Sequence, residues 1–116
     1  MTSDYEVLAL NESQSAVIVL TGQVDRDAAT NIAGAYDAAA ATSPTTVVLD
    51  FSRVDYINST GIALIVSLLG RARAEGRAVH AAGLTDHYRQ IFDITRLSDF
   101  IQVYSDVDAA VGSATT

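Results

Sequence analysis

The fold is decided by one stretch, Asp50-Phe51-Ser52-Arg53-Val54-Asp55-Tyr56-Ile57-Asn58-Ser59-Thr60-Gly61. It follows a short β-branched run and precedes the longest apolar helix candidate of the chain. We therefore expect a strand that leaves the core, a tight surface turn, and a buried helix that starts with the last residues of the stretch. A helix N-terminus carries unsatisfied N–H groups and partial positive charge, so a hydroxyl there can cap the helix or carry a phosphate.

The order of the predicted elements is ββαβαβαβα. The strands are expected at Tyr5–Leu10, Ala16–Leu20, Thr45–Asp50, Ala78–Ala82 and Phe100–Tyr104. The helices are expected at about Arg26–Ala41 with Asp25 as N-cap, Ser59–Glu75 with Gly76 as C-cap, Asp86–Asp93, and Ser105–Gly112 opened by a capping box of Ser105 and Asp108. Strands separated by single helices build a mainly parallel sheet, and the first two form an antiparallel edge hairpin. We expect one α/β domain over residues 5–112.

Composition narrows the class of function. The chain has 116 residues and a net charge of −7, contains no cysteine, and all seven of its basic residues are arginine. An acidic domain without a basic block is a poor binder of nucleic acid or anionic lipid. No apolar run approaches the roughly 18 residues of a membrane span, and the N-terminus lacks the features of a signal peptide. We expect a cytoplasmic protein, not inserted in a membrane, that binds another protein.

The helix after the focal stretch has two contrasting sides. The side expected against the sheet carries Ile62, Ile65, Val66, Leu68, Leu69 and Ala72, whereas the opposite side carries the small residues Ala63, Ser67, Gly70 and Ala74. This small-residue stripe has two interpretations. It is covered by another element of its own fold or reflects Ala-rich composition, or it is a surface on which a partner docks.

Enzymatic interpretations find little support. Ser59 and Thr60 lack an evident base, because His80 falls in a predicted strand and His87 in a separate helix. The chain contains no lysine, which excludes the usual phosphate-binding loop of nucleotide hydrolases.

Two further hypotheses concern the carboxylates and the hydroxyls. Asp25, Asp50 and Asp55 could gather to hold a divalent cation, although strand-end and cap carboxylates are the commoner case. The remaining hypothesis is a hydroxyl used as a switch, with a simple N-cap as its alternative. Both hold at once if one residue caps and its neighbour carries the switch. No cofactor or metal site is predicted.

Residues Val47 to Leu64 resemble the signature of STAS domains, in particular those of bacterial anti-sigma factor antagonists. Two further segments support the resemblance, Thr21–Asp25 and Leu84–Leu97. It implies an α/β STAS fold with a mixed, mainly parallel sheet and about four helices, packed largely on one side. It also implies a non-enzymatic partner switch in transcription regulation. The unphosphorylated antagonist binds an anti-sigma factor kinase of the histidine-kinase-like ATPase fold and releases a sigma factor, and a PP2C-type phosphatase resets it.

Carried over by position, the resemblance implies that the phosphoacceptor is Thr60, with Ser59 as second choice. The expected partner-binding residues are Asp25, Asn58, Ser59, Thr60, Gly61, Ala63 and Ser67. Asn58 stands where many phosphorylated members have Asp. This departure motivates the alternative, a non-phosphorylated STAS scaffold subunit of a larger complex, such as a stressosome-like or lipid-transport ABC system.

Overall fold

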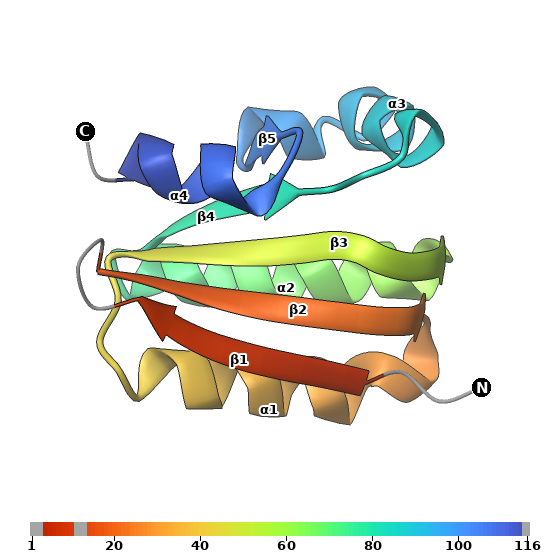
Figure 1. The fold of residues 1–116 in the computed structure, drawn as a ribbon. Coiled ribbons are helices and arrows are strands. Elements are labelled where there is room, and N and C mark those ends of the chain that lie inside the picture. Colours follow the sequence, from red (N-terminus) through yellow and green to blue (C-terminus); the bar gives the residue numbers. More distant parts are fainter. Residues whose placement is uncertain (1–3, 11–13, 115–116) are drawn as a thin grey trace.

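The structure, a computed structural model, describes residues 4–10 and 14–114, which form one sheet and its helices (Figure 1). The strands are β1 (Asp4–Leu10), β2 (Ser15–Val24), β3 (Thr46–Ile57), β4 (Ala78–Ala82) and β5 (Gln102–Tyr104). The α-helices are α1 (Ala29–Ala40), α2 (Ser59–Ala74), α3 (Asp86–Ile94) and α4 (Val107–Ala114). Two short 3-10 helices are η1 (Arg26–Ala28) and η2 (Leu97–Asp99).

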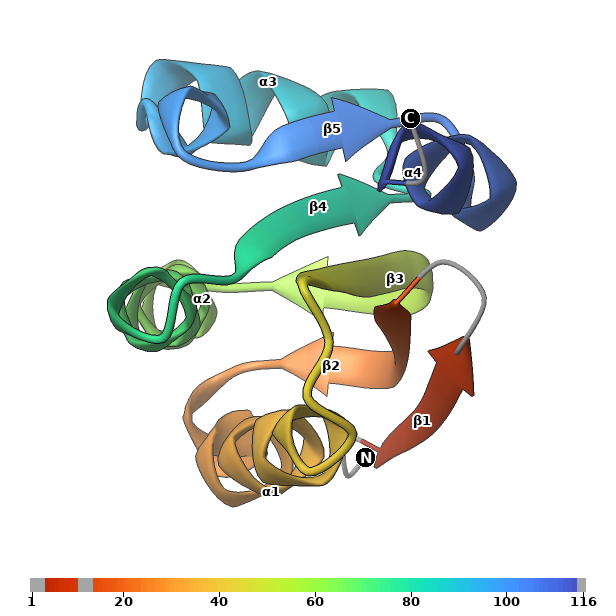
Figure 2. The same cartoon turned by 90° about the vertical axis from the view of Figure 1, so that its left-hand side faces the viewer.

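The sheet order follows the chain order, β1-β2-β3-β4-β5. β1 pairs antiparallel with β2, and each later neighbouring pair is parallel. Because every parallel crossover is right-handed and steps in the same direction, the connecting helices all reach the same face of the sheet. α1, α2 and α3 cover that face, and α4 lies on the other (Figure 2). The predicted α/β fold, with a mainly parallel sheet and helices largely on one side, is confirmed.

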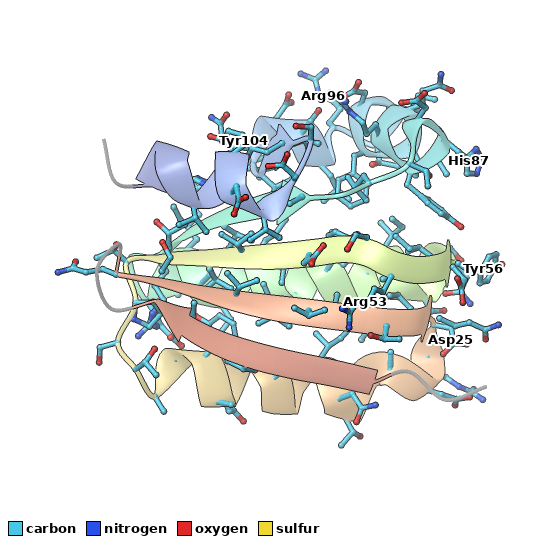
Figure 3. All side chains as sticks on the ribbon, in the orientation of Figure 1. Asp25, Arg53, Tyr56, His87, Arg96 and Tyr104 are labelled. Atoms are coloured by element: carbon cyan, nitrogen blue, oxygen red, sulfur yellow. The ribbon has the colours of Figure 1, made fainter. Side chains whose placement is uncertain are left out.

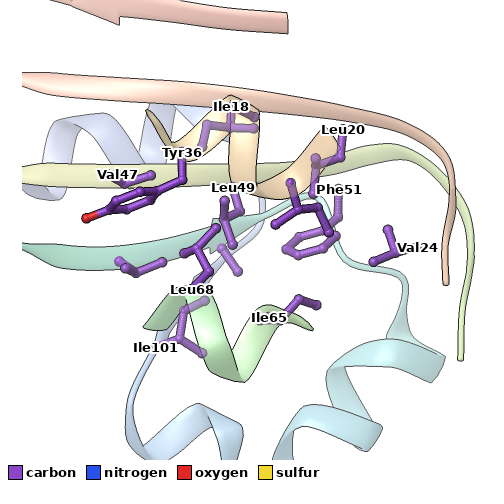
Figure 4. Packing of buried hydrophobic residues seen from close by; sticks show 14 of the residues in the cluster. Ile18, Leu20, Val24, Tyr36, Val47, Leu49, Phe51, Ile65, Leu68 and Ile101 are labelled. Carbon is purple, nitrogen blue, oxygen red and sulfur yellow. The ribbon is translucent and has the colours of Figure 1, made fainter. Parts of the chain in front are cut away.

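The core has two unequal parts, one on each face of the sheet. The larger part joins alternate residues of the central strands to the three helices, with Leu49 and Phe51 facing Ile65 and Leu68 of α2 (Figure 4). The smaller part lies under α4, where Ala110 packs on Val17, Val19, Val48 and Ala82. β2 is therefore buried on both faces, which explains its continuous apolar run.

The predicted tight turn after Asp50 is wrong. β3 continues as a strand to Ile57, and β2 continues beside it to Val24. The pairing shifts register twice along this extension, between Val19 and Thr21 and between Gly22 and Gln23. These irregularities break the alternation of inward and outward side chains, and the stretch therefore looks like a turn in the sequence.

Smaller corrections concern the helices. Val66, expected to face the sheet, is 49% exposed. Asp106, not Ser105, caps α4, since its carboxylate accepts a hydrogen bond from the Ala109 N–H at 2.8 Å. Part of the loop expected before the last strand is the 3-10 helix η2. Because η2 takes up the chain to Asp99, the last strand starts at Gln102 rather than Phe100.

A polar cluster fixes the end of α2 against α1. The hydroxyl of buried Tyr36 donates a hydrogen bond to Glu75 Oε1 at 3.0 Å, and the Arg71 guanidinium lies 4.5 Å above the Tyr36 ring. Arg77 forms an ion pair with Glu75 as well. The Tyr36 hydrogen bond, together with the neighbouring arginines, lowers the pKa of Glu75 below its usual value.

Tyr36→Phe tests this cluster through its pH dependence. A carboxylate whose folded-state pKa is lowered stabilises the fold above its unfolded pKa, and this stability is lost as the pH falls through the folded value. We therefore expect Tyr36→Phe to lower the thermal unfolding midpoint at neutral pH, and the difference from the wild type to shrink in acid. Circular dichroism melts from pH 7 downward measure it. Tyr56→Phe, at a half-exposed tyrosine, is the control, and a pH-independent difference would contradict the assignment.

Candidate functional site

The site is built on the N-terminus of α2, where Asn58 is the N-cap. Its backbone is extended, and its side-chain oxygen accepts a hydrogen bond from the Gly61 N–H at 2.8 Å. Its carbonyl accepts the first helical bond, from the Ile62 N–H at 2.9 Å. Because the cap is supplied by Asn58, neither hydroxyl that follows it is needed to start the helix.

Ser59 and Thr60 are the first two residues of α2, and both are exposed. Amides in the first turn of a helix have no intrahelical acceptor, and the helix dipole places partial positive charge there. The first turn contains no acidic residue. A phosphate on either hydroxyl would therefore lie in a favourable local field while facing solvent.

Gly61 lies in close contact with the end of β2. A Cβ atom on this residue would lie 1.9 Å from the Val24 carbonyl oxygen and 2.7 Å from its carbon. The same oxygen accepts a hydrogen bond from the Asn58 N–H at 3.2 Å. Any side chain at position 61 would push the helix away from β2, so the glycine is required by packing.

Asp25 directly follows Val24 and is therefore brought next to the α2 N-terminus. It caps η1, since its Oδ1 accepts a hydrogen bond from the Asp27 N–H at 3.0 Å. Figure 3 shows Asp25, Tyr56 and His87 at the same end of the molecule, where β2 and β3 finish. The structure thus brings Asp25 together with Asn58, Ser59, Thr60 and Gly61.

Helix α3 is tied to the same end by one buried hydrogen bond. The Tyr88 hydroxyl accepts from the Ile57 N–H at 2.9 Å. The His87 ring packs against the Tyr88 ring, with centroids 4.9 Å apart. The last residue of β3 is therefore held by α3 immediately before the cap.

The small-residue stripe continues the surface along α2. Ala63, Ser67, Gly70 and Ala74 are all exposed, so the interpretation that another element of the fold covers them is wrong. Ser67 borders a shallow groove of about 130 Å³ between α1 and α2. Ala63 and Ser67 therefore lie on the open face that leads away from the helix start.

The hydrolase and metal-binding hypotheses find no support in the part of the chain that the structure describes. There, neither Ser59 nor Thr60 hydrogen-bonds to a histidine, and no group of three His, Asp or Glu side chains could hold a metal ion. The Asp50 carboxylate accepts from the Ser52 N–H at 2.9 Å. None of the helices within residues 4–10 and 14–114 is long and apolar enough to cross a membrane.

Two residues of this end were missed by sequence reasoning. Tyr56 is 49% exposed beside the site, and Tyr88 supplies the hydroxyl that fixes Ile57. The sequence predicts a turn at Tyr56, whereas the structure places it in β3. The apolar positions Phe51, Val54 and Ile57, three apart, were the available sign of an irregular strand.

A family model and a curated relative both match most of this chain. The family model described as "Mlab, STAS domain" matches residues 9–103. The chain is similar to the anti-sigma-B factor antagonist of Listeria monocytogenes serovar 1/2a, with 27% identity over 86 residues, which cover 74% of this chain and 75% of the relative.

Two solved structures share the fold. An anti-sigma factor antagonist from Mycobacterium paratuberculosis matches with a TM-score of 0.84 and 20% identity, over 99% of this chain and 96% of the other. The Bacillus cell fate determinant SpoIIAA in its phosphorylated form matches with a TM-score of 0.68 and 18% identity, over 94% and 98% of the two chains.

Gly61→Ala tests the contact between α2 and β2. Because the added methyl group overlaps the Val24 backbone, we expect the variant to lose about 3 kcal/mol or more of unfolding free energy. Urea denaturation followed by circular dichroism measures the loss.

Gly70→Ala is the matched control on the same helix. A Cβ atom there meets nothing within 4 Å. It should therefore stabilise the protein by up to about 1 kcal/mol through helix propensity alone. Equal effects of the two substitutions would refute the steric role of Gly61.

Proposed function

The chain belongs to the STAS domain family, and from this premise we propose that it is an anti-sigma factor antagonist, a non-enzymatic partner switch controlled at the N-terminus of α2. The observation that carries the proposal is the pair of exposed hydroxyls, Ser59 and Thr60, directly after a cap that another residue supplies. A hydroxyl that does not cap the helix can be modified without loss of the cap.

Thr60 is the proposed phosphoacceptor and Ser59 the second choice. Phosphorylation adds between about −1.5 and −2 charges at pH 7 and three strong acceptors. The start of α2 tolerates that charge, since helix N-termini favour anions. A protein docked on the same turn would instead bury the phosphate and lose affinity, so modification would change binding without unfolding the domain.

The proposed partner-binding surface runs from the turn onto the open face of α2. It comprises Asp25, Asn58, Ser59, Thr60, Gly61, Ala63 and Ser67. Gly61 is buried and contributes by letting the helix start approach β2, whereas Ala63 and Ser67 let a partner backbone come close. We propose that this surface lies within one domain spanning residues 5–112.

The proposed partner is an anti-sigma factor that is also a kinase of the histidine-kinase-like ATPase fold. In its unphosphorylated form the protein would bind this kinase in the cytoplasm and so release a sigma factor. A PP2C-type phosphatase would reset the switch. Two similar proteins are named as antagonists of anti-sigma factors, which supports an anti-sigma factor as the partner. The Bacillus protein of the same fold has a phosphorylated form, which supports the modification.

A second candidate function is a constitutive scaffold without phosphorylation. Asn58 favours it, because its neutral amide caps the helix through the Gly61 N–H and puts no carboxylate beside the hydroxyls. The matching family model, described as "Mlab, STAS domain", is a second reason to keep it. Such a subunit would use the same surface of α2 without a switch.

The phosphorylation step is tested by incubating the protein with ATP and the anti-sigma factor kinase from the same organism. We expect one phosphate per chain, mapped by mass spectrometry to Thr60, and none in Thr60→Ala. Thr30→Ala is the matched control, because Thr30 is also exposed and is the second residue of α1. Absence of label from both Thr60 and Ser59 would reject the switch and favour the scaffold.

Binding is tested with Thr60→Asp, which places a charge where the phosphate would lie. We expect its affinity for the kinase to fall about tenfold or more, because a buried interfacial charge without a partner is costly. Isothermal titration calorimetry measures the change. Ser43→Asp adds the same charge at the exposed connection before β3 and should bind like the wild type. Unchanged affinity in Thr60→Asp would remove the turn from the interface.

A further inference from the structure

A groove of about 630 Å³ lies beside the C-terminal half of α2, between this helix, the start of β4 and the segment around η2. It exists because α3 packs at the other end of the strands. There the Phe92 ring meets the Phe51 ring edge-on at 6.0 Å, and Tyr88 holds Ile57. The groove is therefore lined by the start of β4 together with α2 and the η2 segment, and Figure 2 shows β4 between α2 and α3.

The charge of this groove is opposite to that of the protein. Three arginines, Arg73, Arg77 and Arg96, line it together with one carboxylate, Asp99, whereas the whole chain has seven arginines against 14 acidic residues. Arg77 is held by Glu75 and by the Pro44 carbonyl. The Arg73 side chain makes no ion pair or hydrogen bond with the described residues, so its guanidinium is free to bind an anion.

Apolar side chains complete the lining. Val66 and Leu69 lie on the same side of α2 as Arg73, at helical spacing. Val66 is 49% exposed and Phe100, across the groove, is 64% exposed. Between them Gly70 contributes no side chain, and a Cβ atom there would meet nothing within 4 Å. The result is an open apolar trough with guanidinium groups at its border.

Arg96 adds a conformational observation. It follows α3 with φ 65° and ψ 17°, the left-handed region that favours glycine. Its Nε donates to Asp99 Oδ2 at 3.0 Å in an exposed ion pair, which contributes little stability. An arginine is therefore present where glycine would suit the fold better, and its side chain lines the groove.

We propose that this groove binds a small amphipathic anion, with a phosphate or carboxylate held by Arg73 and Arg96 and an apolar group against Val66, Leu69 and Phe100. The planar guanidinium fork pairs with both kinds of oxyanion in a bidentate manner. The volume falls within the usual range of small-molecule sites, about 300 to 1,000 Å³. The site is separate from the α2 N-terminus, so it does not rest on the proposed partner switch.

The test uses the full chain labelled with ¹⁵N and 1-naphthyl phosphate as the probe. We expect saturable shifts of the backbone amides of Gly70, Arg73 and Phe100. Because both parts of the ligand contribute, 1-naphthol and inorganic phosphate should each bind about tenfold more weakly or worse. Equal binding of 1-naphthol, or shifts confined to the start of α2, would overturn the proposal.

Variants separate binding from folding. Arg73→Gln should weaken binding about fivefold or more, whereas Arg53→Gln, at an exposed arginine that does not line the groove, should leave it unchanged. Gly70→Phe should fill the trough and abolish binding in a protein that remains folded. Wild-type affinity in either Arg73→Gln or Gly70→Phe would refute the site.

Arg96→Gly gives a readout that a purely structural role would not produce. It relieves the left-handed backbone and should raise the thermal unfolding midpoint while weakening the binding of 1-naphthyl phosphate. If the variant is more stable and binds the probe as well as the wild type, Arg96 is not part of the anion site.

Discussion

The close approach of Gly61 to the Val24 carbonyl is the contact on which the candidate site depends. It lets α2 begin directly against the end of β2, and the same carbonyl accepts the Asn58 N–H at 3.2 Å. One peptide group of β2 therefore sets both the position of the helix and the geometry of its cap. Asn58 makes the cap, and the Gly61 backbone makes the contact with Val24. Ser59 and Thr60, which lie between Asn58 and Gly61, are therefore exposed and have no structural role.

Chain order in the sheet explains why α2 presents different surfaces at its two ends. Each parallel crossover steps one strand along the sheet, so the three helices line up on one face. α3 has only nine residues and is anchored by Tyr88 and Phe92 at the end where β3 finishes. The start of α2 is consequently held by the end of β2 and, through Ile57, by α3, whereas its later turns border the groove lined by Arg73. The proposed partner surface and the proposed small-molecule groove therefore lie on different parts of one helix.

The sequence predicted the elements well where one rule dominated. The bounds of β4 and the positive φ of Gly76 just after α2 follow from short-range signals, and the structure agrees with them. The Asp25 cap is also present, although it starts η1 and α1 begins only at Ala29. The prediction was wrong where two backbones interact over distance. The extension of β3 to Ile57 depends on irregular pairing with β2, and its local sign is limited to the three-residue spacing of Phe51, Val54 and Ile57. Likewise, Val66 is exposed because α3 lies elsewhere, and the groove beside it could not be inferred from helical periodicity.

Asn58 bears on function because the fold does not decide its identity. The cap requires an oxygen that accepts the Gly61 N–H, and an amide or a carboxylate supplies it equally well. A carboxylate would even gain from the helix dipole, so stability gives no reason to prefer Asn. We therefore relate the neutral side chain of Asn58 to the proposed partner that binds at the start of α2. Beside an unmodified hydroxyl it lowers the repulsion of a negatively charged partner, and beside a phosphorylated one it avoids adding a third negative charge to the helix start. In either proposed function both effects would act at the surface of a complex, so the choice between switch and scaffold would lie with the partner rather than with the stability of this domain.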